Sequence, residues 1–458
     1  MNVDDLAWQA GNYGGIPPRG VTSLLEHGHL DLVIRAAAER GEWFCATGSV
    51  AELCRTGRFE RALEVMEPFV ATGWPAAAWE KAGILLRAGR SRAALALVRP
   101  AEAGRASKAD CHDFAGLLVR AGYVDEAIDL LVPLVDGWWT LSVLVEITEG
   151  QGRDERVLEL IAPHAESARR AAGTENRWSH PFADAQELQA QVLERAGRAE
   201  EAIRILGRDI SGRLYLTQNT LTAYAGLLAR HGRLDALREL ATGQHAHTVL
   251  DVYAGALRDG GRAGEAEAVM RDAIAADDWV GYRAWLSSAL LRDGRLDDAI
   301  AVAEPGFGWY DCSNLLVPLV YALLDRPEEL LRLVEHPSVV RHHGHEEFQH
   351  GWRASALAAL GRLDEAIALA EAHPDSWTDP RIFKAGLFTA AGRLDDAAAE
   401  LRAVGTIKAR EELCEVLVRQ GRAAEAIAVH PTVAEQRAAQ QQREPAPVDG
   451  NGYALEPP

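Results

Sequence analysis

The sequence predicts an all-α fold in which helix-turn-helix units repeat and stack into an α-solenoid. A glycine-containing turn recurs along the chain, and its clearest copy is residues 360–367, LGRLDEAI. Successive turns are 29 to 45 residues apart and average about 33, the period of two-helix repeats. We therefore expect about thirteen repeats. The turn glycines are Gly57, Gly89, Gly122, Gly152, Gly197, Gly232, Gly261, Gly294, Gly361, Gly392 and Gly421, and looser turns stand at Gly28 and Asp325-Arg326.

The residues around each turn predict where its first helix, helix A, ends and its second, helix B, begins. Glycine readily adopts the left-handed backbone conformation that terminates a helix. Acidic residues follow the turn, where they suit the positive end of the next helix dipole. The N-cap oxygen of helix B is expected from Asp125, Asp297, Asp364 and Asp395.

Small residues recur in phase with the turns and predict where helices pack. Five residues after the turn glycine, an alanine recurs on helix B. Six residues before it, helix A often carries a glycine, which costs about 1 kcal/mol against alanine inside a helix. We expect another helix to approach closely at these glycines. They are Gly83, Gly116, Gly226, Gly255 and Gly386. Most of the tryptophans are also in phase, and we interpret them as wedges between repeats.

Composition limits the classes of partner and compartment. The net charge is −19, from 67 acidic and 48 basic residues, which argues against binding a phosphate backbone. Five cysteines without Cys-x-x-Cys spacing indicate neither a disulfide framework nor a thiolate metal site. No apolar run is long enough to span a membrane. We therefore predict a cytoplasmic protein without a membrane or nucleic-acid partner, and the scarcity of lysine is typical of a high-GC bacterial genome.

The repeats divide the chain into three parts. Residues 1–20 are expected to form an N-terminal arm or cap, and residues 21–431 the repeat array, with irregular stretches at 163–186 and 335–351. Residues 432–458 are polar and contain proline, so we expect a disordered C-terminal tail.

These turns and spacings resemble the tetratricopeptide repeat family over nearly the whole of residues 21–430. The shared features are the period of about 33, the turn glycine, the Asp/Glu-Glu-Ala-Ile start of helix B and an early aromatic in helix A. The resemblance implies a right-handed superhelix whose helices A line a concave groove for a peptide or partner protein. It departs from the subclass that grips a C-terminal carboxylate, because the positions six before the turn are never asparagine.

A histidine-rich stretch is the one candidate for metal chemistry. Its weak candidate ligands are His342, His343, His345 and His350. His345 and His350 are five residues apart and diverge by about 140° on a helix, whereas the metalloprotease motif needs a spacing of four. We expect a solvated polar loop. No hydrolase or phosphate-binding motif is present, so we predict no catalytic residues and no cofactor.

The predicted function is a non-enzymatic scaffold or adaptor that binds a protein or peptide. The acidic composition favours partner segments that carry Arg or Lys. One alternative is a regulatory sensor that binds a peptide or small molecule and signals to a separate effector. A second is a metal-dependent activity at the histidine-rich stretch. The sequence leaves the partner and the oligomeric state open.

Overall fold

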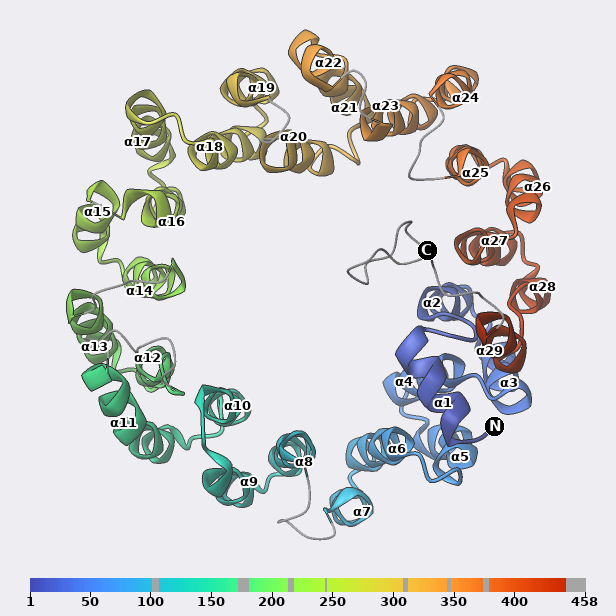
Figure 1. The fold of residues 1–458 in the computed structure, drawn as a ribbon, viewed down its shortest axis with the longest axis horizontal. Helices are drawn as coiled ribbons and strands as arrows, with labels where there is room; N and C mark the ends of the chain where they lie inside the picture. Colours follow the sequence, from blue (N-terminus) through green and yellow to red (C-terminus); the bar gives the residue numbers. More distant parts are fainter. Residues whose placement is uncertain are drawn as a thin grey trace, which may run out of the picture. The chain divides into compact units, whose positions relative to one another are not determined.

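The computed structural model describes residues 1–100, 107–171, 181–212, 218–243, 245–307, 312–343, 347–373 and 379–441 (Figure 1). The chain forms two compact units, of which the first combines Met1–Arg99 with Glu346–Pro458 and the second is Pro100–His345. Every regular element among the described residues is a helix. The predicted all-α fold of packed helix pairs is therefore confirmed.

The first unit contains helices from both ends of the chain. They are α1 (Val3–Asn12), α2 (Pro18–Glu26), α3 (Leu30–Arg40), α4 (Trp43–Arg55), α5 (Phe59–Val70), α6 (Pro75–Arg87), α7 (Ser91–Val98), α23 (Glu347–Ala359), α24 (Leu363–Ala372), α25 (Pro380–Ala390), α26 (Leu394–Val404), α27 (Ile407–Arg419), α28 (Ala423–Ala428) and α29 (Val433–Gln441).

The second unit contains the middle repeats. Its elements are α8 (Lys108–Arg120), α9 (Val124–Leu131), the 3-10 helix η1 (Val132–Leu134), α10 (Trp138–Ile147), α11 (Asp154–Ala171), α12 (Ala185–Arg195), α13 (Ala199–Gly212), α14 (Gln218–Arg230), α15 (Leu234–Thr242), α16 (Ala246–Asp259), α17 (Ala263–Ala276), α18 (Val280–Arg292), α19 (Leu296–Ala303), the 3-10 helix η3 (Glu304–Gly306), α20 (Cys312–Tyr321), α21 (Pro327–Val334) and α22 (Pro337–His343).

Each predicted turn separates a helix A from a helix B. The pairs are α2/α3, α4/α5, α6/α7, α8/α9, α10/α11, α12/α13, α14/α15, α16/α17, α18/α19, α20/α21, α23/α24, α25/α26 and α27/α28. The eleven assigned turn glycines have φ between 65° and 87°. At the clearest copy the N–H of Arg362 bonds to the carbonyl of Leu357 at 2.9 Å and that of Gly361 to Ala358 at 3.0 Å. These are the two bonds of a Schellman helix terminus.

The start of helix B differs from the expectation that an aspartate caps it. The N-cap residue of α24 is Arg362, without a side-chain cap, and Asp364 lies inside the first turn. The other three aspartates also lie in the first turn of their helices. At several turns the arginine after the glycine pairs with an acidic residue three positions on, as Arg362 does with Glu365 at 2.8 and 2.7 Å. The same pair occurs at Arg198–Glu201, Arg262–Glu265, Arg295–Asp298, Arg393–Asp396 and Arg422–Glu425.

The small residues recur for two different reasons. The alanines five after the turn are fully buried, and all nine have 0% exposure: Ala62, Ala94, Ala127, Ala202, Ala266, Ala299, Ala366, Ala397 and Ala426. The helix-A glycines do not serve packing, contrary to expectation. A Cβ added at Gly83, Gly116, Gly255 or Gly386 would meet nothing within 4 Å, and one at Gly226 would meet only the Arg230 side chain. The close helix approach is made by the alanine one position earlier, which is at most 1% exposed in Ala82, Ala115, Ala225, Ala254 and Ala385.

The tryptophans only partly act as wedges. Trp43 of α4 is buried and meets Trp74 edge-on, with ring centroids 4.6 Å apart, so these rings join two successive repeats. By contrast Trp138 and Trp139 are 44% and 61% exposed. The phase of a tryptophan therefore does not determine whether it is buried.

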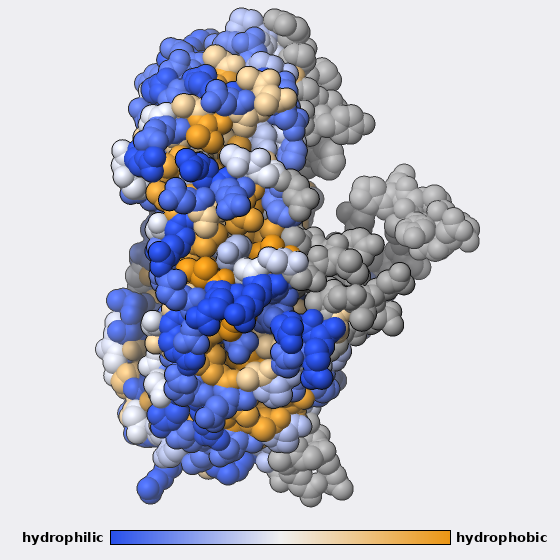
Figure 2. Space-filling view, turned by 90° about the vertical axis from the view of Figure 1, so that its left-hand side faces the viewer, coloured by the Kyte–Doolittle hydropathy of each residue, from blue (hydrophilic) through white to orange (hydrophobic). Residues whose placement is uncertain are grey.

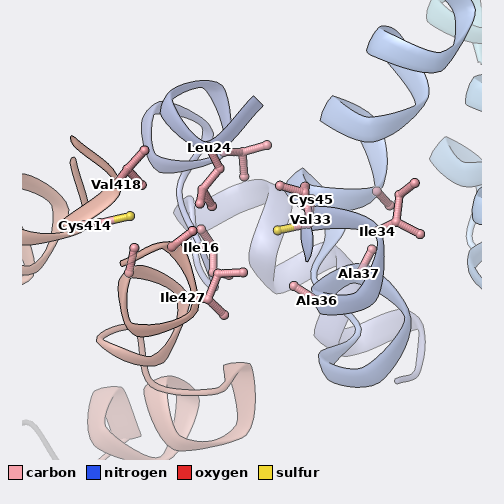
Figure 3. Packing of buried hydrophobic residues seen from close by; sticks show 14 of the residues in the cluster. Ile16, Leu24, Val33, Ile34, Ala36, Ala37, Cys45, Cys414, Val418 and Ile427 are labelled. Carbon is pink, nitrogen blue, oxygen red and sulfur yellow. The ribbon is translucent and has the colours of Figure 1, made fainter. Parts of the chain in front are cut away.

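The two ends of the repeat array pack on each other within the first unit (Figure 3). Helix α2 contacts α27 and α3 contacts α28. Helix A of the first repeat therefore packs on helix A of the last, and helix B on helix B, as between consecutive repeats. One buried core includes Ile16 and Leu24 from the start of the chain and Val418 and Ile427 from its end. At Gly20 an added Cβ would lie 3.3 Å from Cys414 Sγ, so here the absence of a side chain does permit close approach.

The largely buried side chain of Arg40 makes polar contacts between the two ends of the chain. Its guanidinium donates to the carbonyls of Ile427 at 3.1 Å, His430 at 2.8 Å and Pro431 at 3.2 Å. It also pairs at 2.9 Å with Glu42, whose side chain is 1% exposed. Burial raises the pKa of Glu42, while the N–H of Ile16 and the Arg40 charge favour its ionised form. A buried carboxylate needs such a partner.

The C-terminal segment differs from the expected disordered tail over residues 433–441, whereas the N-terminal arm or cap at residues 1–20 remains a prediction. Residues 433–441 form α29, which packs on α1. The Gln436 side chain both accepts from the N–H and donates to the carbonyl of Gly15 at 3.1 Å, and Trp8 Nε1 donates to Gln440 at 2.7 Å. Residues 442–458 lie outside the described residues. A polar helix can thus be held by side-chain hydrogen bonds that its composition does not reveal.

The two irregular stretches also contain helices. Helix α11 continues through Pro163 to Ala171, and residues 172–180 lie outside the described residues. The second stretch includes the additional short helix α22. No helix among the described residues has the length and apolar character needed to cross a bilayer.

The contrast between the two kinds of glycine can be tested in the pair α25/α26. We expect Gly392→Ala to destabilise the pair by roughly 1 to 2 kcal/mol, because φ is 75° there and an L side chain is strained. We expect Gly386→Ala to stabilise it by roughly 0.5 to 1 kcal/mol, because this glycine lies inside a helix facing open space. Hydrogen exchange of the α25 and α26 amides measures both changes. Shifts of the same sign would contradict the distinction.

The contact between the ends should also weaken in acid. His430 is 6% exposed, and burial together with the nearby Arg40 and Arg410 lowers its pKa to about 4. The unfolded chain therefore binds the proton more tightly than the folded chain. The contribution of His430 to the free energy of unfolding is fully present above about pH 6.5 and is lost as the pH falls towards 4. Between pH 7.5 and 5 we expect the wild type to lose about 2 kcal/mol more than His430→Gln in urea unfolding. Parallel pH profiles would contradict this role of His430.

Candidate functional site

An open groove lies between two consecutive helices A, α8 and α10, in the second unit. It has a volume of about 710 Å³. One wall is α8 with Gly116, and the other is α10 with Trp139, Val143 and Glu146. We call it the helix-A groove. It lies on the helices that the resemblance assigns to ligand binding.

The floor and rim of the helix-A groove suit an extended chain. Gly116 has no side chain, and nothing lies within 4 Å of where a Cβ would be, so a ligand backbone could approach the helix there. Trp139 is 61% exposed and offers a large rigid apolar surface. Such a ring is the type of residue that contributes most to binding energy at protein interfaces.

The charge of the helix-A groove is predominantly negative. Asp113, Glu146 and Glu149 line it together with a single guanidinium, that of Arg120. None of the three carboxylates makes an ion pair with a described residue. His112 also lines the groove, and desolvation lowers its pKa, so the ring is neutral at pH 7. The groove therefore carries two more negative than positive charges.

Charges on the helices B of the same repeats are used differently. Asp125 of α9 accepts from Arg153 at 2.9 and 2.8 Å and from Arg156 at 2.8 Å. The hydrogen bond from Arg153, together with that from Arg156, lowers the pKa of Asp125 to about 2. Similar pairs join consecutive helices B at Arg198–Glu155 and Arg295–Glu267. Figure 2 shows the side on which α11, α13 and α15 lie, where hydrophilic residues surround hydrophobic bands. Helix-B carboxylates thus link repeats, whereas those of the groove are unpaired.

The histidine-rich stretch is only partly described. His345 lies outside the described residues, as do the side chains of His342 and His343. His350 stacks on His373, with ring centroids 3.7 Å apart. No cluster of three or more potential metal ligands occurs among the described residues. His342 and His343 lie in α22 and His350 lies in α23, so the expected polar loop is not found at these three residues.

The sequence does not identify this groove. Glu146 stands six before Gly152, at the position where other helices A carry a glycine, but this does not distinguish α8 and α10 from the other helices A. Trp139 lines the groove, whereas the adjacent Trp138 does not. Only the arrangement of α8 beside α10 shows which of the two rings belongs there.

Comparison with known proteins does not define a family for this chain. No protein-family model and no curated protein matches the chain. Among solved structures, Naa15/Naa10 bound to HypK-THB is 17% identical, with a TM-score of 0.36, over 84% of this chain and 67% of that one. PPR10 from maize is 15% identical (TM-score 0.31; 91% and 67%), and yeast Tom70 10% (TM-score 0.28; 86% and 94%). The similarity concerns the helical-repeat fold alone.

A structure of PPR10 in complex with an 18-nt RNA element is also similar to this chain, at 15% identity and a TM-score of 0.31. The exclusion of nucleic acid, made from the net charge, is untested and remains a prediction.

Proposed function

We propose that this protein is a non-enzymatic scaffold that binds an extended, basic segment of a partner protein on the exposed faces of its helices A. The observation that carries the proposal is the combination, in one groove, of a bare glycine, an exposed tryptophan and three carboxylates that make no ion pair with a described residue. By contrast, the carboxylate of Asp125 on the neighbouring α9 is held by Arg153 and Arg156.

Physical considerations favour an extended segment over a small molecule at this groove. It is wide and open, so it offers area along two helices. Helices that are already ordered lose little conformational entropy on binding, which favours recognition of a flexible partner segment. The excess of carboxylates attracts Arg and Lys and disfavours acidic segments.

The proposal can be tested with random 12-residue peptides displayed against the full-length protein. We expect the selected peptides to be enriched in Arg and Lys, and their affinity to fall as salt is added. For a selected peptide, fluorescence anisotropy should show that Trp139→Ala weakens binding by about tenfold or more. The matched control is Tyr123→Ala, which removes an exposed ring at the preceding turn outside the groove and should change little.

A variant at Gly116 distinguishes an effect on peptide binding from an effect on folding in the same assay. Gly116→Gln should raise helix stability by several tenths of a kcal/mol while its side chain obstructs the groove. Weaker peptide binding by a more stable protein would support the proposal. Selection of acidic or neutral peptides, or equal effects of Trp139→Ala and Tyr123→Ala, would refute it.

A further inference from the structure

A second open pocket lies in the second unit, where α13 meets α14. It has a volume of about 800 Å³. We call it the α13 pocket, because most of its lining belongs to one side of that helix. Helix α14 contributes Tyr224, and α13 contributes Glu200, Arg204, Gly207, Arg208 and Ser211.

The two helices behind the α13 pocket are held by a buried core. Ala202 and Leu206, on the opposite face of α13, are 0% and 3% exposed and belong to that core. The ring of Tyr224 packs against the same core from α14. The pocket is therefore built on two ordered helices, which hold its polar groups in place.

Two positive charges line the α13 pocket without a counter-ion. Arg204 and Arg208 are both exposed, and neither forms an ion pair with a described residue. Residues four apart on a helix project from the same face, so these two like charges destabilise α13. An anion bound between the two guanidiniums would remove this repulsion.

The neighbouring carboxylates do not neutralise the two guanidiniums. Glu200 also lines the pocket but pairs with Arg233 of α15, and Glu201 pairs with Arg198 at 2.8 Å. Asp209 is 2% exposed and does not line the pocket. Two guanidiniums and one carboxylate leave the described lining with a net positive charge, although the net charge of the whole chain is −19.

Tyr224 adds a hydrogen-bond donor to the α13 pocket. Its hydroxyl lies over Gly207, because a Cβ added at this glycine would be 3.0 Å from Tyr224 Oη. The hydroxyl makes no hydrogen bond with a described residue. Burial raises the pKa of Tyr224, so the hydroxyl keeps its proton at neutral pH. Three groups with unused donors thus line one pocket.

These donors suit a phosphate monoester better than other anions. Its oxygens accept several hydrogen bonds and carry nearly two negative charges at neutral pH, which two guanidiniums and a hydroxyl complement. A carboxylate is satisfied by one guanidinium. A nucleic acid would bring many phosphates to a strongly acidic chain, whereas a single phosphate on a polypeptide would not.

We propose that the α13 pocket binds the phosphate group of a phosphorylated residue in a partner protein. The guanidiniums of Arg204 and Arg208 hold its oxygens, and the Tyr224 hydroxyl donates a further hydrogen bond. Phosphorylation of the partner would then control its docking on α13. This site does not depend on the helix-A groove, because the two share no lining residue.

The experiment is fluorescence anisotropy with the full-length protein at pH 7.5. The probe is a labelled pool of 11-residue peptides with a central phosphoserine and random flanking residues other than Arg and Lys, so that the helix-A groove does not contribute. Matched pools carry serine or aspartate at the centre. We expect the phosphoserine pool to bind at least about tenfold more tightly than the serine pool and about threefold more tightly than the aspartate pool. Inorganic phosphate should compete only weakly.

Variants of the lining locate the site. Arg204→Gln and Arg208→Gln should each weaken binding of the phosphoserine pool by about fivefold or more, and Tyr224→Phe by about threefold. The matched control is Arg238→Gln, which removes an exposed arginine of α15 outside the pocket and should change little. Trp139→Ala should also leave this binding unchanged. Circular dichroism checks that every variant folds.

Three results would overturn the proposal. They are equal binding of the phosphoserine and serine pools, tighter binding of inorganic phosphate than of the phosphoserine pool, and equal losses in Arg204→Gln, Arg208→Gln and Arg238→Gln. None of them affects the basic-peptide assay of the helix-A groove, so the two proposals fail separately.

Discussion

A stack of helix pairs has an apolar face at each end that must be covered, and this requirement explains much of the first unit. The last repeat covers the first, with α2 on α27 and α3 on α28. Apolar residues from both ends share one core, while Arg40 satisfies three carbonyls of the closing segment and the buried Glu42. Helix α29 lies at this contact, where it packs on α1.

Within the repeats, ion pairs join consecutive units through both helix types. Arg153–Asp125 and Arg198–Glu155 join helices B, while Arg230–Glu194 joins the helices A α12 and α14. The alanines of helices B are fully buried. Helices A keep glycines that face open space although each costs helix stability. A feature that weakens the fold without a packing reason is better explained by what the exposed face binds.

Much of the fold could be predicted because its determinants are local. The left-handed turn glycine and the period of about 33 residues depend on a few neighbouring positions. The helix-A glycines were misinterpreted because sequence shows that a side chain is missing but not what lies opposite it. The contact of Arg40 with His430 joins residues 390 positions apart. That contact leaves no local signal in the sequence.

The rest of the first unit depends on the contact between the chain ends. Hydrogen exchange of an Arg40→Met variant tests this contact directly. Methionine keeps the apolar stem but leaves Glu42 and three carbonyls without their donor. We predict that the amides of α28 and α29, 383 to 401 residues away in sequence, exchange at least about tenfold faster, while those of the middle repeats are unchanged. Unaltered exchange in α28 and α29 would contradict it.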